Sequence, residues 1–534
     1  MDNKTVNRKV GGVVLEEQEK PESGKAQSTE KIDPYGTQVV YQNRRYVGTK
    51  ETAAYILNNI SNTFNINMYG SRFIYDVLKI DFRFLAILGT IGGVWDVIND
   101  VIIGVIVDRT RTRYGKFRPY LITLEAPLIL LGSVGWLLPV FFPNTPADYV
   151  PKFVVYFIFN IITETAGTFT NISSTGLLST ITPHPIDRTR LITMAQFYSG
   201  FVEKGPQIIM GVLIDLIDYN VFKIQLKSLY IFMGLLTQFI SAGMSIFFFI
   251  VSKERVMQSI EQPSIKQGLK SILNNKPMLI IVLSQFLSGF SVGTNKINYY
   301  IDVLGTASIN TIVGIPGAFV SPASYALVPW ARRRFSTKAI WIAGDIYLDI
   351  LWISVLGIGS INGTYLKKWR MIPILMIEET LEMLSWGIGS VIPNEIYNEA
   401  MDYCEWKNGY RTEAMTGVAK GLITKIQNVI MNVFNNIVMQ KIGYVQGMKI
   451  GTQANNTKFW LFVLSTGLPT ITRMLGVVPK FYYNLSAEKR EKMYEELFER
   501  RKAMAAAMAG ADEQEMARLG KAQMNGEFLS DTKL

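Results

Sequence analysis

Apolar segments long enough to cross a lipid bilayer recur along most of this chain. A transmembrane helix needs about 20 mainly apolar residues to cross ~30 Å of hydrocarbon. The mean hydropathy is +0.18 and only 18% of the residues are charged, whereas a soluble chain of 534 residues would expose far more charge. The sequence therefore predicts an all-α integral membrane protein with twelve transmembrane helices. They are expected near residues 50–75, 82–107, 118–141, 152–181, 191–217, 228–251, 277–303, 308–330, 338–360, 370–395, 412–441 and 457–482.

A polar stretch divides these segments into six and six. Residues 252–276 form this expected cytoplasmic loop, between a first bundle over residues 49–251 and a second over 277–484. Residues 1–48 are polar and mixed in charge, which is typical of a disordered tail. Residues 485–534 have heptad-like apolar spacing with i,i+4 charges, which indicates a helical tail. Two six-helix bundles joined by a cytoplasmic loop are the architecture of the major facilitator fold.

Basic residues gather in alternate loops, and this asymmetry predicts the orientation. The segments after helices two, four, six, eight and ten carry DRTRTRYGKFRP, IDRTR, SKERV, ARRRFSTK and EWKNGYR. These loops and both tails are expected in the cytoplasm, and the chain in the plasma membrane as a multi-pass protein. YLKKWR at 365–370 is an exception, being basic and predicted outside. The net charge of +11 is attributed to the cytoplasmic loops, so no nucleic-acid partner is expected.

The chain has one cysteine, Cys404, and one histidine, His184. A lone cysteine excludes an internal disulfide framework, and two such residues cannot make a four-ligand zinc site. His184 lies in a short polar segment predicted to be a loop, which argues against histidine-based catalysis. We therefore expect no enzymatic activity and no cofactor.

The predicted second helix contains the residues that point most directly to chemistry. Asp96, Asn99 and Asp100 follow i, i+3 and i+4 spacing and share one helical face inside an apolar segment. Ionised carboxylates in hydrocarbon require a partner, a cation or water. The set is consistent with a site for a hard cation, with an acid pair that takes up a proton, or with a structural ion pair to a lysine of another helix.

The same helix runs into a charged segment. Gly104 is expected to permit close helix approach. Asp108 can pair with an arginine such as Arg109 or lie at a neighbouring helix N-terminus, and such contacts could hold the cytoplasmic side closed. The alternative is a solvated basic loop that only sets the topology.

Three separated motifs resemble those of the glycoside–pentoside–hexuronide:cation symporter family, which includes melibiose and glucuronide carriers. The first is WDVINDVIIGVIVDRTRTRYGKFRPYL, the second is DYCEWKNGYRTEA at 402–414, and the third combines LSTIT at 178–182 with DRTR at 187–190. Glycine is usual in that family at the Cys404 position. The resemblance covers about residues 50–485 and implies the major facilitator fold.

The resemblance also implies residue roles. Asp96, Asn99 and Asp100 match the family's cation-binding helix, Thr168 falls where sodium-using members place a hydroxyl ligand, and Lys425 matches a lysine near the cation and sugar sites. Na+ or H+ is the expected coupling ion. A cytoplasmic gate is expected among charged residues at that end of the bundle: Asp108, Arg109, Arg118, Glu399, Asp402 and Arg411.

The expected sugar site departs from the melibiose-carrier pattern. Counting along the chain places that pattern's two carboxylates at Ile60 and Asn171, and its arginine at Gln196. Amides and an apolar residue thus replace charged side chains, which leaves a hexuronide or its glycoside as one possible substrate.

Polar residues of helix one, and one aromatic residue of helix ten, are the other sugar candidates. Asn59, Thr63 and Asn67 lie on helix one, with Thr63 and Asn67 expected on the face of Ile60. Amides both donate and accept, so they can read sugar hydroxyls, but they also bond between membrane helices. Trp386 can stack on a sugar ring or serve only in packing.

These observations predict a secondary active transporter that carries a sugar (a glycoside, pentoside or hexuronide) with Na+ or H+ by alternating access. Its expected partners are the sugar, the coupling cation and the lipid bilayer, while the tails do not identify a partner. Three alternatives stay open, namely an uncoupled facilitator, a carrier of a non-sugar organic solute, and a membrane sugar sensor.

Overall fold

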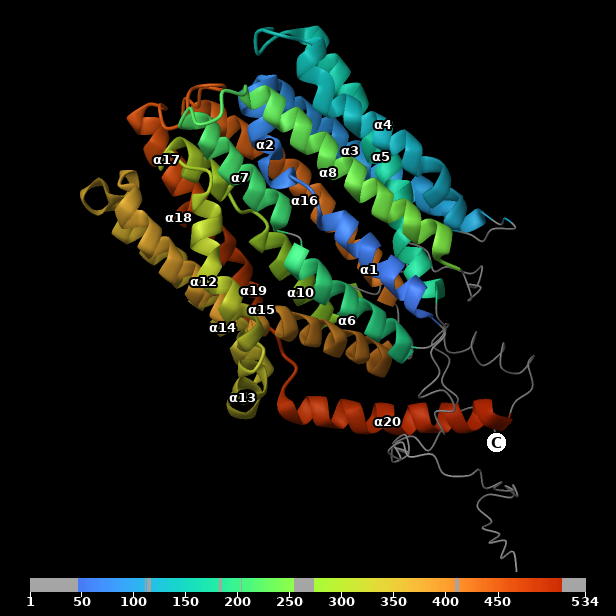
Figure 1. Cartoon of the computed structure of the whole chain (residues 1–534). Helices are drawn as coiled ribbons and strands as arrows, with labels where there is room; N and C mark the ends of the chain where they lie inside the picture. Colours follow the sequence, from blue (N-terminus) through green and yellow to red (C-terminus); the bar gives the residue numbers. More distant parts are fainter. Residues whose placement is uncertain are drawn as a thin grey trace, which may run out of the picture. The chain divides into compact units, whose positions relative to one another are not determined.

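The structure is a computed structural model of the chain, and its regular elements are helices (Figure 1). It describes residues 47–110, 112, 117–181, 185–202, 204–253, 273–408 and 413–510. The first tail up to residue 46, most of the central loop and the chain beyond residue 510 lie outside these described residues.

The first half contains a helical element in each of the six predicted segments. The first segment begins as a regular helix and continues through three short helical pieces. Its elements are α1 (Thr49–Thr63), η1 (Asn67–Tyr69), α2 (Gly70–Arg72), η2 (Phe73–Leu78), α3 (Phe82–Arg109), α4 (Arg118–Phe141), α5 (Val150–Ile181), α6 (Pro185–Val202), α7 (Gly205–Asp218) and α8 (Leu226–Val251).

The second half likewise has helices in all six predicted segments, followed by a further helix. Its elements are α10 (Lys276–Ser288), α11 (Lys296–Asp302), α12 (Ile309–Ser324), α13 (Leu327–Arg334), α14 (Thr337–Ser360), η3 (Ile361–Leu366), α15 (Lys368–Asn408), α16 (Glu413–Lys441), α17 (Asn455–Ser465), α18 (Gly467–Arg473), η4 (Met474–Gly476), α19 (Val477–Lys480) and α20 (Ala487–Gly510).

Several predicted spans are broken rather than continuous. By length and hydropathy, five helices of the described residues qualify as membrane spans, or up to seven if each of two bent pairs counts as one span. The bends are 56° between α12 and α13 and 41° after α17. Local sequence favours some of these breaks, because Pro206 opens α7 and Pro316 and Pro322 lie within α12.

The helices pack within each half and across the two halves. In the first half α1 packs on α6 and α8, and α4 on α5 and α8, whereas in the second α15 packs on α12 and α14. The main helix contact between the halves is that of α16 with α3. Large apolar side chains such as Leu130 and Phe319 are exposed, as expected for surfaces that face lipid.

The helix α20 packs against α15 of the second half, as seen below the bundle in Figure 1. Met493 and Leu497 are almost fully buried and belong to a core that also contains Ile396 and Met401 of α15. The indole of Trp406 donates a 2.6 Å hydrogen bond to Glu496. The regularly spaced apolar residues of α20 are therefore the ones that pack against α15.

Candidate functional site

Two glycines of α3 allow α16 to approach closely. A Cβ atom added at Gly93 would lie 2.2 Å from Cγ2 of Val429, and one at Gly89 would lie 2.7 Å from the side-chain oxygen of Asn432. At Gly93 the neighbour is a stiff β-branched side chain, so close contact there requires glycine, whereas at Gly89 the amide of Asn432 could turn aside. The expectation that Gly104 permits close approach is wrong for the described residues, because none of their atoms would lie within 4 Å of a Cβ atom there.

This approach brings one lysine of α16 between two carboxylates of α3. The ammonium of Lys425 lies 2.8 Å from Asp96 and 2.5 Å from Asp100. We call these three residues the triad. Their side chains are about a quarter to a third exposed, so the triad lies at the edge of a cavity. The triad links the two halves of the molecule by charge.

The third polar residue of this face points to a different helix. Asn99 is buried and its Nδ2 donates a 3.0 Å hydrogen bond to the hydroxyl of Thr168 on α5. The Thr168 hydroxyl donates in turn to the carbonyl of Glu164 at 3.1 Å. One turn earlier, the indole of Trp95 donates to Thr165 at 2.8 Å. The predicted cation residues are thus divided between two contacts of α3, one with α16 and one with α5.

Two polar cavities of about 390 Å³ each share residues of α16, and the first of them adjoins the triad. The first contains Asp96, Glu164 and Lys425. The second lies between α2, α11 and α16. It is rich in amides, and its lining includes Thr294, Asn295, Asn298, Asn428, Asn432, Asn435 and Asn436.

The asparagines of α16 were missed by the sequence reasoning. Asn428, Asn432 and Asn435 recur at helical spacing in a segment predicted to span the membrane. That spacing was available as a signal, since polar residues on one face of a membrane helix need a polar neighbour.

The predicted sugar residues of helix one do not form a single face. The side-chain oxygen of Asn59 accepts a 2.6 Å hydrogen bond from Ser199, and the hydroxyl of Thr63 donates to the carbonyl of Ile60 at 3.0 Å. Because α1 ends at Thr63, Asn67 does not continue the Ile60 face, and that expectation is wrong.

Asn67 and Asn171 instead line another cavity, of about 660 Å³, within the first half. Its walls come from α1, α4, α5 and α8 and include Glu125. Trp386 lies on α15 and is 49% exposed. The structure therefore places the sugar candidates in several surroundings rather than one site.

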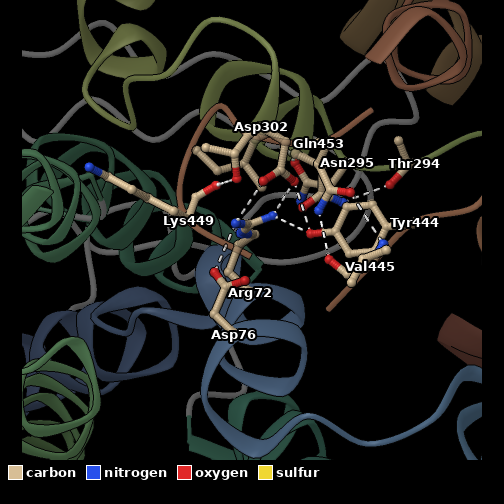
Figure 2. A network of polar contacts seen from close by, with 12 residues as sticks. Arg72, Asp76, Thr294, Asn295, Asp302, Tyr444, Val445, Lys449 and Gln453 are labelled. Carbon is tan, nitrogen blue, oxygen red and sulfur yellow. Dashed lines mark hydrogen bonds and ion pairs between the residues drawn. The ribbon is translucent and has the colours of Figure 1, made fainter. Parts of the chain in front are cut away.

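A buried arginine joins the halves at one end of the molecule (Figure 2). Arg72 is 1% exposed and pairs with Asp302 of α11, with Asp76 at 2.8 Å, and with the hydroxyl of Tyr444 at 2.6 Å. We call these four residues the Arg72 network. Sequence reasoning missed it, although Arg72 and Asp76 have i,i+4 spacing at the end of an apolar segment.

Further hydrogen bonds close the same end. The carboxylate of Asp215 on α7 accepts from the backbone N–H groups of Ala307 at 2.6 Å and Ser308 at 2.9 Å, just before α12. Gln446 of the second half donates to the carbonyl of Ile80 at 2.7 Å. Three polar contacts thus tie the halves together there.

The predicted gate residues that the structure describes contact other parts of the chain. Glu399 is buried and pairs with Arg490 of α20 at 3.1 Å, and Asp402 accepts a 3.3 Å bond from Tyr494. Burial and the neighbouring Asp402 carboxylate raise the pKa of Tyr494 to about 12, which keeps its hydroxyl a donor. Arg118 donates to the carbonyl of Phe249 at 3.4 Å.

The remaining gate candidates are Arg411, which lies outside the described residues, and Asp108 and Arg109, whose side chains do too. The gate as a whole stays a prediction. What the structure adds is an anchor for α20 on the two acidic residues of α15.

Known proteins resemble this chain over most of its length. Residues 48–487 match the family model described as "MFS/sugar transport protein". The chain is 24% identical over 443 residues to an isoprimeverose transporter of Lactiplantibacillus pentosus, covering 81% of this chain and 88% of that protein. It is 23% identical over 463 residues to the glucuronide carrier protein homolog of Escherichia coli (strain K12), covering 84% and 95% respectively.

Solved structures share the fold. A D-xylose-proton symporter has a TM-score of 0.50 and 13% sequence identity, and the likeness covers 82% of this chain and 95% of that one. A mutant of the nucleoside transporter NupG also has a TM-score of 0.50, with 13% identity and coverage of 81% and 98%. These two proteins carry different solutes, so the likeness speaks for the architecture alone.

Proposed function

Because this chain belongs to the MFS/sugar transport protein family, we propose that it is a secondary active transporter that moves a sugar across the plasma membrane together with Na+ or H+. Family membership confirms the major facilitator fold and the predicted resemblance, and it places the chain among transporters rather than enzymes. The identity of the coupling ion and the residues that bind it are the proposed part.

The observation that carries the proposal is the triad at the contact of α3 with α16. The Lys425 ammonium occupies the space between the Asp96 and Asp100 carboxylates, where a transported cation would bind. A proton or Na+ must therefore compete with Lys425 for the same oxygens. Since Lys425 belongs to the other half, binding of the cation weakens a charge contact that holds the halves together.

The two candidate ions make different demands on the neighbouring residues. A proton needs only a carboxylate, whereas Na+ needs several oxygen ligands. The hydroxyl of Thr168 and the amide of Asn99, bonded to each other at 3.0 Å, are the neutral oxygen groups proposed to complete a Na+ site with the two carboxylates.

The proposed sugar site is the amide-lined cavity between α2, α11 and α16, which shares wall residues with the cavity that adjoins the triad. Asparagine both donates and accepts hydrogen bonds, which suits the hydroxyls of a sugar. Lys425 lines the neighbouring cavity, which shares Asn428 and Asn432 with this one, so it can serve a uronate carboxylate that extends between the two once a cation has released it. This arrangement suits glycosides, pentosides and hexuronides, and relatives named for isoprimeverose and glucuronide support that range.

Transport follows from alternating access of the central cavities to the two sides. With both tails in the cytoplasm, the Arg72 network lies at the external end, and its bonds close that end in this structure. Cation and sugar binding must each favour the other, because coupling is reciprocal. The two halves then rock about the contact of α3 with α16.

The test is uptake of labelled sugars into proteoliposomes under an imposed Na+ or H+ gradient, with isoprimeverose, xylose and a glucuronide as probes. We expect one of them to accumulate, and Asp96→Asn or Asp100→Asn to abolish accumulation while sugar exchange without a gradient persists. Asp81→Asn at the start of α3 is the matched control, because its side chain can still cap the helix.

Two outcomes would overturn the proposal. If Asp96→Asn accumulates sugar as the unaltered protein does, the triad is not the coupling site. If the unaltered protein equilibrates sugar but never concentrates it under either gradient, the chain is an uncoupled facilitator.

A further inference from the structure

The second half carries an acidic cluster that the proposed coupling does not use. Glu378, Glu379 and Glu382 of α15 place carboxylate oxygens within 4.8 Å of one another. We call these three residues the glutamate trio. The trio lies on α15, whereas the triad lies between α3 and α16.

The buried member of the trio has no hydrogen-bonding partner. Glu378 is 3% exposed, and neither of its carboxylate oxygens has a hydrogen bond among the described residues. An ionised carboxylate in that position would be buried without a hydrogen bond, which disfavours its charged form. A protonated carboxyl removes that charge and gains an O–H donor for a neighbouring carboxylate.

A lysine already neutralises part of the trio. The ammonium of Lys296 lies 3.9 Å from Glu379 and 3.8 Å from Glu382, and 3.8 Å from the ring centre of Trp352. The indole of Trp352 also donates a 3.2 Å hydrogen bond to Glu382. One ammonium therefore already lies beside two of the three carboxylates and would repel a metal cation there, which favours a proton as the missing positive charge.

Among the other titratable groups around the trio, Lys204 is a second cation, but it acts on Glu379 rather than on the buried Glu378. Tyr300 of α11 and Tyr347 of α14 are the nearby phenols, and Lys204 approaches Glu379 from the first half. The helix α12, which packs along α15, contributes no titratable side chain. The acids of α14, Asp345 and Asp349, are paired elsewhere, with Lys480 and Arg473.

We propose that the glutamate trio is a second proton-binding site, with the proton carried by Glu378 and the remaining charge balanced by Lys296. Its setting gives this proton a role in transport. Lys296, Tyr300 and Glu379 line a cavity of about 260 Å³ whose other wall includes Lys204 and Gln207 of the first half. Loss of the proton adds a negative charge behind Lys296 and draws its ammonium away from this cavity.

The proposal goes beyond the sugar–cation symport above and is tested without any sugar. The full chain is reconstituted in lipid, and the carbonyl stretch of protonated carboxyl groups is followed by infrared spectroscopy as the pH is varied. At neutral pH, Glu378→Gln should remove the signal of one protonated carboxyl per molecule. Because glutamine mimics the protonated acid, this variant should fold as the unaltered protein does.

Three further variants make the result specific. Glu395→Gln is the matched control on the same helix, since Glu395 pairs with Arg332 at 2.7 Å and should contribute no protonated signal. Asp96→Asn should leave the Glu378 signal intact. Lys296→Gln should increase the number of protons that the trio holds at neutral pH.

Clear results would overturn the proposal. If a folded Glu378→Gln variant keeps the neutral-pH signal unchanged, Glu378 carries no proton. If added Na+ removes the Glu378 signal at constant pH, the trio is a metal-cation site instead. Either outcome would leave the triad and its proposed coupling role untouched.

Discussion

At the scale of single side chains, the central question is which positive charge lies between Asp96 and Asp100. Lys425 fills that space in this structure. In the proposed mechanism it is a tethered competitor, since a cation that binds between these carboxylates must first displace it.

Removing the competitor should tighten cation binding. We expect Lys425→Met to raise the apparent affinity for the coupling cation at least tenfold, which corresponds to about 1.4 kcal/mol. The melting temperature measured against Na+ concentration, and against pH, reports this affinity. Lys420→Met on the same helix should leave both dependences unchanged, and equal affinities in the two variants would contradict the competitor role.

A variant that lacks the hydroxyl of Thr168 should distinguish coupling to Na+ from coupling to H+. Thr168→Val keeps the shape of the side chain but removes the oxygen that accepts from Asn99. Na+-driven uptake should fall at least tenfold, whereas H+-driven uptake should not change, because a proton needs no hydroxyl ligand. Thr170→Val is the control, since that hydroxyl bonds to the carbonyl of Gly167 within its own helix.

At the scale of whole helices, the fit of α3 against α16 depends on the absence of side chains. Gly93→Ala places a methyl group 2.2 Å from Val429 and should destabilise the protein by about 1–3 kcal/mol. Thermal unfolding in detergent measures the change. Adding Val429→Ala should recover part of the loss, and Gly104→Ala should have little effect because its surroundings are open.

The anchoring of α20 makes a second prediction at this scale. Arg490→Gln leaves the buried carboxylate of Glu399 without its cation, so α20 should detach more readily, at a cost of about 1–3 kcal/mol. Limited proteolysis within α20 should become faster by about tenfold or more. Lys492→Gln, at an exposed position of the same helix, should be cleaved at the original rate.

The sequence predicted the positions of the helices better than their internal shape. The length of an apolar run is a local property, so all twelve predicted segments contain helices. The break after Thr63 and the gap between α10 and α11 lie inside predicted apolar runs, and the length of a run does not mark them. The helix predicted to end at residue 395 continues to Asn408, because its polar end is covered by α20.

The same distinction applies to the site. Spacing along one helix predicted that Asp96 and Asp100 would lie together, and a lysine in an apolar helix predicted a carboxylate partner for Lys425. Which glycine permits the contact could not be predicted, since Gly93 and Gly104 look alike in sequence and differ only in their neighbours. The Arg72 network joins residues more than 200 positions apart, beyond the reach of any local pattern.

At the scale of the whole molecule, one end is closed by the Arg72 network and by a large apolar core that includes Tyr69, Tyr299 and Phe462. Opening that end requires Arg72 and Asp302 to separate. Their pairing should therefore set how often the central cavities reach the external side.

Weakening the Arg72 network should expose the two cavities that share Ser71 to the external side. In a Cys404→Ser background, Ser71→Cys places a reporter thiol in the wall shared by the two cavities near the triad. Adding Arg72→Gln should raise its labelling by a membrane-impermeant thiol reagent several-fold when the reagent is added outside cells. Arg83→Gln, an exposed arginine nearby, should not, and equal labelling would show that the network does not control access.

The triad also has an electrical consequence. Two carboxylates and one ammonium give it a formal charge of −1 when no cation is bound, and a bound cation brings it to zero. One charge that crosses the whole membrane exchanges about 2.3 kcal/mol with a potential of 100 mV. An inside-negative voltage therefore favours the state in which the unloaded triad is open to the outside, while the neutral loaded triad changes access without electrical work. The membrane potential would then drive the return of the empty carrier to its outward-facing state, and not the inward step that carries cation and sugar.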